Sequence, residues 1–482
     1  MAKSRDRKKA PSERATLENE EQRIEEQSVD EQKPKRAISR RSFLKTGVGT
    51  AGGLFLASRL GGSFARAQDY PALGNFPVRG STVVFGFNVP QTGSYADEGA
   101  DELRAYELAV RHLNEGGGIL ETMQPLALTG QGVLGKRVDF VTGDTQTDPD
   151  AARASARRMI ERDGVIMFSG GSSSAVAIAQ QYLAQEAGVI FMVGLSHSND
   201  TTGKDRRRYG FRHFFNAYMS GQALGPILAQ EYGNDRRAFH LTADYTWGHT
   251  QLESMRNSTE SQGWTTARNI MTPLGLQDYS QYLTAFLNSD ADVLILNHYG
   301  QDMVNSLTQA VRFGIKDMDR NGKQVQIVVP LYSRLMASGA GDAIEGIFGS
   351  TNWSWKMDDP GSQAFTQAFE AEYGQPPSQA AQTAYVQTIL YADAAERAGT
   401  FYPPEVIRAL EDHDIQGIGP GTTTYRGCDH QAFHDMLVVQ GKSPSERENE
   451  FDLLETVAQI DRDSVMYECD FFPGELGPYK DE

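Results

Sequence analysis

The sequence has few cysteines, no excess of positive charge and none of the common catalytic motifs. Its 482 residues include only two cysteines, and 63 acidic residues outnumber 46 basic ones for a formal net charge of −17. This acidic balance opposes binding to nucleic acid or to an anionic membrane, so neither partner is expected.

The missing motifs argue against an enzyme. The run "GQGVLGKR", residues 130–137, has phosphate-loop spacing, but Arg137 replaces the magnesium-binding Ser or Thr, and the run precedes a strand. No G-x-S-x-G, H-E-x-x-H or C-x-x-C occurs. His430 and His434 have chelating i,i+4 spacing without a third ligand, so an exposed helical pair is the simpler interpretation. We therefore expect no catalysis, no metal and no cofactor.

The N-terminal segment lacks the pattern of a folded domain. Residues 1–38 are mostly charged or small and polar, which predicts disorder. Residues 39–67 contain Arg40-Arg41, a short apolar stretch and an A-x-A site ending at Ala67, the pattern of a twin-arginine signal peptide. The apolar stretch is too short to span a bilayer. We expect export by the Tat machinery to the periplasm, with cleavage after Ala67.

The two cysteines, Cys428 and Cys469, both lie near the C-terminus. In an oxidising exported compartment, one disulfide that clamps the tail is favoured over catalysis or metal binding. Two free thiols are the alternative.

From residue 81 onward, short apolar runs alternate with helical segments. This alternation predicts an α/β fold with parallel sheets covered by helices on both faces. It is weakest between residues 210 and 237, which indicates a boundary between two Rossmann-like lobes and a ligand cleft between them. The chain would cross the hinge three times. The expected divisions are residues 81–214 with 331–417 for lobe 1, 215–330 with 418–445 for lobe 2, and 446–482 for a C-terminal extension.

Serine-rich turns follow two neighbouring strands in "VIMFSGGSSSAVAIAQQYLAQEAGVIFMVGLSHSND", residues 165–200. Ser172 and Ser173 precede a helix, where free backbone N–H groups and the positive end of the helix dipole suit a carboxylate or a neutral carbonyl. Plain N-capping would need only one serine. The turns therefore predict half of a ligand site.

Aromatic side chains occupy comparable positions elsewhere along the chain. Tyr95 follows the first strand, Trp247 and Tyr299 follow strands of the second lobe, and Trp353 lies in a connecting segment. Ligand contact is the functional interpretation of these residues, and core packing is the alternative.

The chain resembles the periplasmic solute-binding proteins of branched-chain amino-acid-type (Leu/Ile/Val-binding-like) ABC transporters, which have the periplasmic-binding type I fold. The resemblance covers residues 82–440 and depends on a combination of motifs. They are "TGSYADEG", "GGGI", "LGKRVDFVTGDTQTDPDAA", "SGGSSSAVA", "DYTWGHTQLESM", "LQDYSQYLTAFLNSDADVLIL", "VRFGIK" and "YRGCDHQAFHDMLVV".

The resemblance implies roles for several residues. Ser172 and its neighbours would bind a ligand carboxylate, assisted by Ser196 and His197, while Tyr95 and Trp247 would cover the ligand from opposite lobes. Leu276 stands where amino-acid-binding relatives have an acidic residue for the ammonium group. An α-amino acid would therefore need a substitute such as Asp244 or Asp278. The loop at 120–133 is an insertion relative to the family pattern.

These observations predict a monomeric extracytoplasmic protein that captures a small organic solute (an amino acid, an amide or a carboxylate) and delivers it to an ABC transporter permease. A sensory ligand-binding protein of the same fold is the alternative, followed by an exported α/β enzyme.

Overall fold

The structure is a computed structural model that describes residues 70–123 and 126–480. The predicted disordered segment and signal peptide lie outside the described residues. Residues from Gln68 onward form one compact unit, and it contains two large sheets, each with its own hydrophobic core. Among the helices described, none is both long and apolar enough to cross a membrane.

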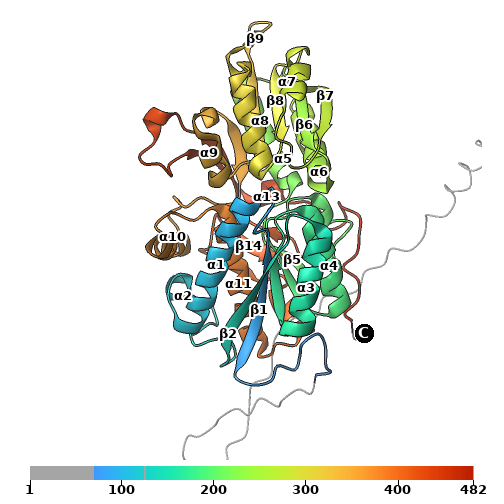
Figure 1. Cartoon of the computed structure of the whole chain (residues 1–482), viewed down its shortest axis with the longest axis vertical. Coiled ribbons are helices and arrows are strands. Elements are labelled where there is room, and N and C mark those ends of the chain that lie inside the picture. Colours follow the sequence, from blue (N-terminus) through green and yellow to red (C-terminus); the bar gives the residue numbers. More distant parts are fainter. Residues whose placement is uncertain (1–69, 124–125, 481–482) are drawn as a thin grey trace, which may run out of the picture. The chain divides into compact units, whose positions relative to one another are not determined.

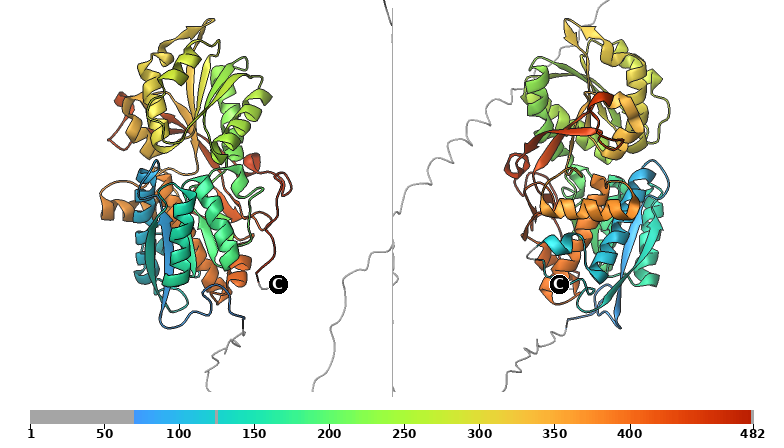
Figure 2. Two further views of the ribbon diagram at one scale, coloured as in Figure 1. Left: turned by 45° about the vertical axis from the view of Figure 1, so that its right-hand side comes forward. Right: turned by 90° about the vertical axis from the view of Figure 1, so that its left-hand side faces the viewer.

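The first lobe is built on a parallel sheet of order β2-β1-β3-β4-β5 (Figures 1 and 2). Its central strands are buried on both faces, because helices cover both sides of the sheet. The strands are β1 (Thr82–Val89), β2 (Arg137–Asp144), β3 (Met167–Gly170), β4 (Ile190–Val193) and β5 (Gly210–Arg212). The helices are α1 (Ala96–Glu115), α2 (Ile119–Thr122), α3 (Pro149–Arg158), α4 (Ser174–Ala187), α10 (Pro360–Tyr373), α11 (Gln379–Ala398) and α12 (Pro403–Leu410).

The second lobe contains a seven-stranded sheet of order β17-β16-β12-β11-β8-β6-β7. Its pairs are parallel except at β16 and β17, which run antiparallel to their neighbours. The strands are β6 (Arg237–Ala243), β7 (Thr265–Thr272), β8 (Val293–Asn297), β11 (Gln326–Leu331), β12 (Phe348–Thr351), β16 (Met436–Gly441) and β17 (Leu454–Ile460). The helices are α5 (Ala217–Tyr232), α6 (Thr246–Ser261), α7 (Ser280–Leu287), α8 (Gly300–Arg312) and α9 (Arg334–Ala340).

Smaller elements complete the fold. A three-stranded antiparallel sheet lies between α12 and β16, a two-stranded hairpin precedes β11, and a short helix follows β17. They are β13 (Asp414–Gln416), β14 (Thr422–Tyr425), β15 (Ala432–Phe433), β9 (Asp319–Arg320), β10 (Lys323–Gln324) and α13 (Arg462–Val465).

The two-lobed α/β fold predicted from the sequence is confirmed. The chain passes to the second sheet after β5, returns to the first lobe after β12, and passes back after β15. Residues 331–351 were expected in lobe 1. The structure differs, because β12 pairs with β11 in the second sheet. A Cβ at Gly349 would lie 2.3 Å from the Val329 carbonyl oxygen, so glycine allows this close pairing.

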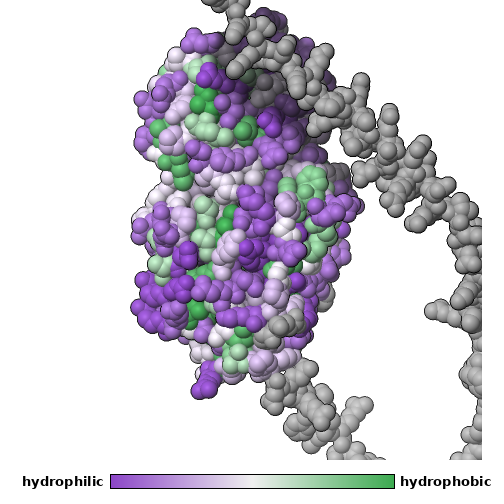
Figure 3. Space-filling model, turned by 90° about the vertical axis from the view of Figure 1, so that its right-hand side faces the viewer, coloured by the Kyte–Doolittle hydropathy of each residue, from purple (hydrophilic) through white to green (hydrophobic). Residues whose placement is uncertain are grey.

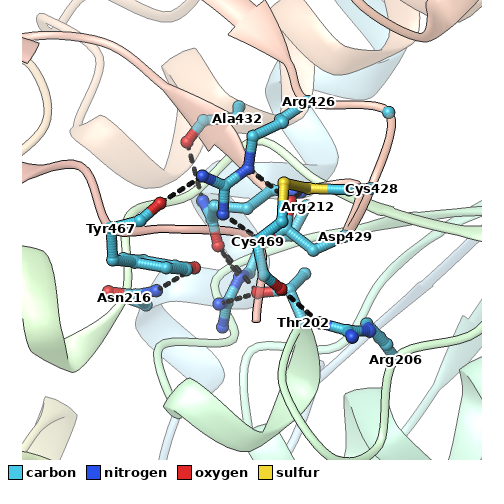
Figure 4. Close-up of polar contacts among 12 residues, drawn as sticks. Thr202, Arg206, Arg212, Asn216, Arg426, Cys428, Asp429, Ala432, Tyr467 and Cys469 are labelled. Carbon is cyan, nitrogen blue, oxygen red and sulfur yellow. Dashed lines mark hydrogen bonds and ion pairs between the residues drawn. A yellow bond between two sulfur atoms is a disulfide. The ribbon is translucent and has the colours of Figure 1, made fainter. Parts of the chain in front are cut away.

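The C-terminal segment also differs from the predicted extension, because β17 pairs with β16 as an edge strand of the second sheet. The tail then returns to the first lobe, where the N–H of Arg208 donates to the Leu476 carbonyl at 2.7 Å. Cys428 and Cys469 form a disulfide at the start of this return (Figure 4).

On the face shown in Figure 3, hydrophilic residues predominate and apolar residues form small scattered patches. Each lobe has its own core of large apolar side chains.

Candidate solute-binding site

The first serine turn joins β3 to α4. Gly170 has φ of +124°, and a Cβ there would lie 2.2 Å from the Asn88 carbonyl oxygen, so the turn can pass close to β1 only with glycine. The Ser174 hydroxyl accepts hydrogen bonds from the backbone N–H groups of His197 (3.1 Å) and Ser198 (3.0 Å). This serine therefore ties the two predicted serine turns together.

The other two serines of the turn do not cap the helix. Ser173 occupies the N-cap position of α4 but makes no side-chain capping hydrogen bond. The buried Ser172 hydroxyl donates to Glu102 Oε2 at 2.6 Å. Plain capping thus does not account for either side chain.

The second serine turn, residues 195–202, is held by the fully buried guanidinium of Arg212 (Figure 4). This group donates to the backbone carbonyls of Ser196 and Ser198 and to the Thr202 hydroxyl. The Ser196 hydroxyl lies 2.6 Å from the Thr201 hydroxyl, so it is engaged within the loop. Arg212 therefore positions the backbone of this turn.

His197 links the two lobes. Its Nδ1 lies 2.8 Å from the Phe215 carbonyl oxygen, and its Nε2 lies 3.0 Å from the side-chain oxygen Oε1 of Gln251 on α6. Burial lowers the pKa of His197 to about 3, so the imidazole is neutral at physiological pH. A neutral ring donates from only one of its two nitrogens, so it donates to one of these two oxygens.

Aromatic side chains from both lobes meet at the junction. The hydroxyl of Tyr95 lies 2.8 Å from that of Tyr245, and the Tyr95 ring centroid lies 5.3 Å from that of Tyr299. Trp247 packs against Tyr299 and His197, with centroid distances of 6.3 and 6.1 Å. All are buried except Tyr245, which is partly exposed. The lobes are therefore in direct contact through Tyr95, Tyr299, Trp247 and His197.

Two buried carboxyl groups beside these aromatic rings escaped the sequence reasoning. Glu98 and Glu102 lie one turn apart on α1, with exposures of 2% and 0%. Burial raises the pKa of each to about 8. Their i,i+4 spacing directly after Tyr95 was the signal that could have found them, because it places both on one helix face.

Three predicted site residues make other contacts. Trp353 packs in the core of the first lobe, where its Nε1 donates to the Ser362 hydroxyl at 2.8 Å. Asp244 is 59% exposed and pairs with His249. Leu276 is partly buried and directs its carbonyl to the Asn305 side chain.

Two further acids near these positions have defined partners: Asp278, which the sequence analysis named, and Asp302, which it did not. Both carboxylate oxygens of Asp302 accept from the Gly275 N–H at 3.0 Å, and Asp278 accepts from the Ser280 N–H. His430 and His434 are buried and lie outside any helix, so the prediction of an exposed helical pair was wrong.

Two α/β lobes that bring polar turns and aromatic rings together at their junction define a two-lobed binding protein. The model of the periplasmic binding protein family matches residues 82–447, and the chain belongs to this family. The resemblance deduced from the sequence motifs is therefore confirmed.

Named relatives agree with this assignment. The chain is 25% identical over 353 residues to Leu/Ile/Val-binding protein homolog 8 of Brucella abortus, covering 69% of this chain and 81% of the relative.

Solved structures share the fold. An amino acid ABC transporter substrate-binding protein from Pseudomonas fluorescens Pf-5 has a TM-score of 0.72 at 22% identity, covering 83% of this chain and all of that one. A solute-binding protein of an ABC transporter from Rhodopseudomonas palustris BisB5, in complex with 3,4-dihydroxybenzoic acid, has a TM-score of 0.68 at 20% identity and covers 80% and 98%. These relatives are transport binding proteins.

Proposed function

We propose that this chain is the extracytoplasmic solute-binding protein of an ABC importer, that it captures a small organic solute by lobe closure, and that it delivers the solute to a membrane permease. The observation that carries the proposal is the contact of Tyr95 with Tyr245 and Tyr299 beside the serine turn. A ligand held there touches both lobes, so binding favours the closed arrangement that a permease can recognise.

The junction offers polar groups for a ligand to satisfy. Trp247 Nε1, the Tyr299 hydroxyl and Glu102 Oε1 are buried without a hydrogen-bond partner. Such atoms carry a desolvation penalty that a bound solute can relieve. A few such hydrogen bonds and aromatic burial support micromolar affinity, roughly −8 kcal/mol.

The cellular part of the proposal depends on the sequence. The twin-arginine pattern at residues 39–67 supports export to the periplasm, and membership in the periplasmic binding protein family supports a permease partner and a monomeric, non-enzymatic role.

Solute binding by the purified full-length chain tests the proposal. The panel contains amino acids, amides, urea, amines and aromatic and aliphatic carboxylates, screened by thermal shift and confirmed by calorimetry and X-ray scattering. We expect at least one solute to raise the melting temperature and reduce the radius of gyration. Replacing Ser172 and Ser173 together by alanine should weaken binding by about tenfold or more while the variant stays folded. Binding without compaction, or no binding to any solute, would contradict the proposal.

A further inference from the structure

The place where the resemblance puts a ligand carboxylate already holds a carboxyl group of the protein. Ser172 donates its only hydroxyl proton to Glu102 Oε2. The other oxygen, Glu102 Oε1, is buried without a hydrogen-bond partner. A ligand carboxylate brought to this turn would meet Glu102 across a short distance in a site of low polarity, which is unfavourable whenever both groups are ionised.

Among the described residues, no positive charge is paired with this acid. Within residues 70–123 and 126–480, no Lys, Arg or His nitrogen makes an ion pair with Glu98 or Glu102. Ionised carboxylates without a partner are rarely buried, because their desolvation is expensive. Glu98 and Glu102 therefore stay protonated at neutral pH, and either would ionise only beside a positive group brought from outside the protein.

The surroundings of Glu102 suit a cation. Burial, and after it the nearby carboxyl groups of Glu98 and Glu102, raise the pKa of the Tyr299 hydroxyl, a side chain of the second lobe. The Tyr299 ring lies between those of Tyr95 and Trp247, with centroid distances of 5.3 and 6.3 Å. Aromatic faces attract positively charged nitrogen groups, most strongly when the site is dry.

We propose that the solute carries a cationic nitrogen group (an ammonium, amidinium or guanidinium) that donates to Glu102 and lies against the rings of Tyr299 and Trp247. This inference rests on the proposed function and narrows its substrate class. The unpartnered Trp247 Nε1 would donate to an acceptor elsewhere on the same solute.

Binding of such a cation has a measurable proton balance. Glu98, Asp101, Tyr106 and Tyr299 are the titratable groups that act on Glu102 or respond to it, and each of them is neutral or acidic. Burial raises the pKa of Glu102 to about 8, so the group is protonated at pH 7. A cation beside it favours ionisation, and the proton passes to the buffer.

Three probes of the same shape separate the alternatives: benzamidinium, benzamide and benzoate, which carry positive, zero and negative charge. Calorimetry at pH 7 in buffers of different ionisation enthalpy gives affinity and proton release together. We expect benzamidinium to bind about tenfold or more tightly than benzoate and to release close to one proton. In Glu102→Gln the preference for benzamidinium over benzoate should fall by about tenfold, and the proton release should disappear. Glu107 is an exposed acid on the same helix, so Glu107→Gln is the matched control. It should change neither the preference for benzamidinium nor the proton release.

The outcomes also separate this inference from the proposed function. Tighter binding of benzoate than of benzamidinium would overturn the cation site and leave solute binding intact. If benzamidinium does not bind while another member of the solute panel closes the lobes, the cation site is also overturned and solute binding stays intact. Equal proton release by the wild type and Glu102→Gln would also overturn the role of Glu102.

Discussion

Gly300 provides a direct test of lobe closure, because it faces the opposite lobe where the two meet. It lies at the start of α8 with φ of +55°, and a Cβ there would lie 2.6 Å from Tyr95 Cδ1 and 2.8 Å from the Ser94 carbonyl oxygen. Substitution by alanine should therefore disfavour the closed arrangement specifically, because Ser94 and Tyr95 belong to the first lobe.

The magnitude has two parts. The left-handed backbone costs an alanine about 1 kcal/mol, but this cost is present in the open and closed arrangements and cancels in binding. The steric conflict exists only when the lobes are closed, and overpacking of this kind costs about 1–3 kcal/mol. The affinity for any solute captured by closure should therefore fall by about 5- to 150-fold.

Gly314 offers a matched control in the same lobe. Its φ of +69° imposes the same backbone strain, and nothing lies within 4 Å of an added Cβ. Calorimetry and X-ray scattering of Gly300→Ala and Gly314→Ala, with and without the best solute of the panel, make the comparison. We expect Gly314→Ala to bind and compact like the wild type. If Gly300→Ala does the same, the reasoning about closure through Tyr95 is refuted.

Two further predictions concern stability. The Cys428–Cys469 disulfide closes a loop with a sequence separation of 41. Replacing both cysteines by serine should therefore lower the free energy of unfolding, measured by chemical denaturation, by about 4 kcal/mol while solute affinity is retained. An unchanged denaturation midpoint would contradict this. Because the pKa of Glu102 is raised from 4.5 to about 8, the native state holds a proton that the unfolded chain loses, and the ligand-free protein loses stability as pH rises through this window. The free energy of unfolding of Glu102→Gln relative to the wild type should therefore increase from pH 4.5 to 8, by up to about 5 kcal/mol. If this difference between variant and wild type does not depend on pH, Glu102 is not protonated in the native state.

Local patterns in the sequence were sufficient for most of the fold. Apolar runs bounded by turn residues marked β1, β3, β4, β6 and β8, because buried parallel strands need continuous apolar side chains. The strand β12, "FGST", escaped because it contains a single large apolar side chain, and its place depends on pairing with β11. The strand β17 escaped for a related reason: an exposed edge strand has no apolar run of its own.

The candidate site also combines features that are local in the sequence with features that depend on tertiary structure. The sequence by itself determined that serine-rich turns follow two neighbouring strands and that aromatic residues begin α1, α6 and α8, because these features are local. Only the tertiary structure decided that Glu102 accepts from Ser172, which is 70 residues away in the chain. It also decided that Asp244 faces solvent and that Trp353 packs in the first core. Burial and pairing of polar groups depend on segments distant in sequence, so neither can be deduced from the spacing of residues along one element.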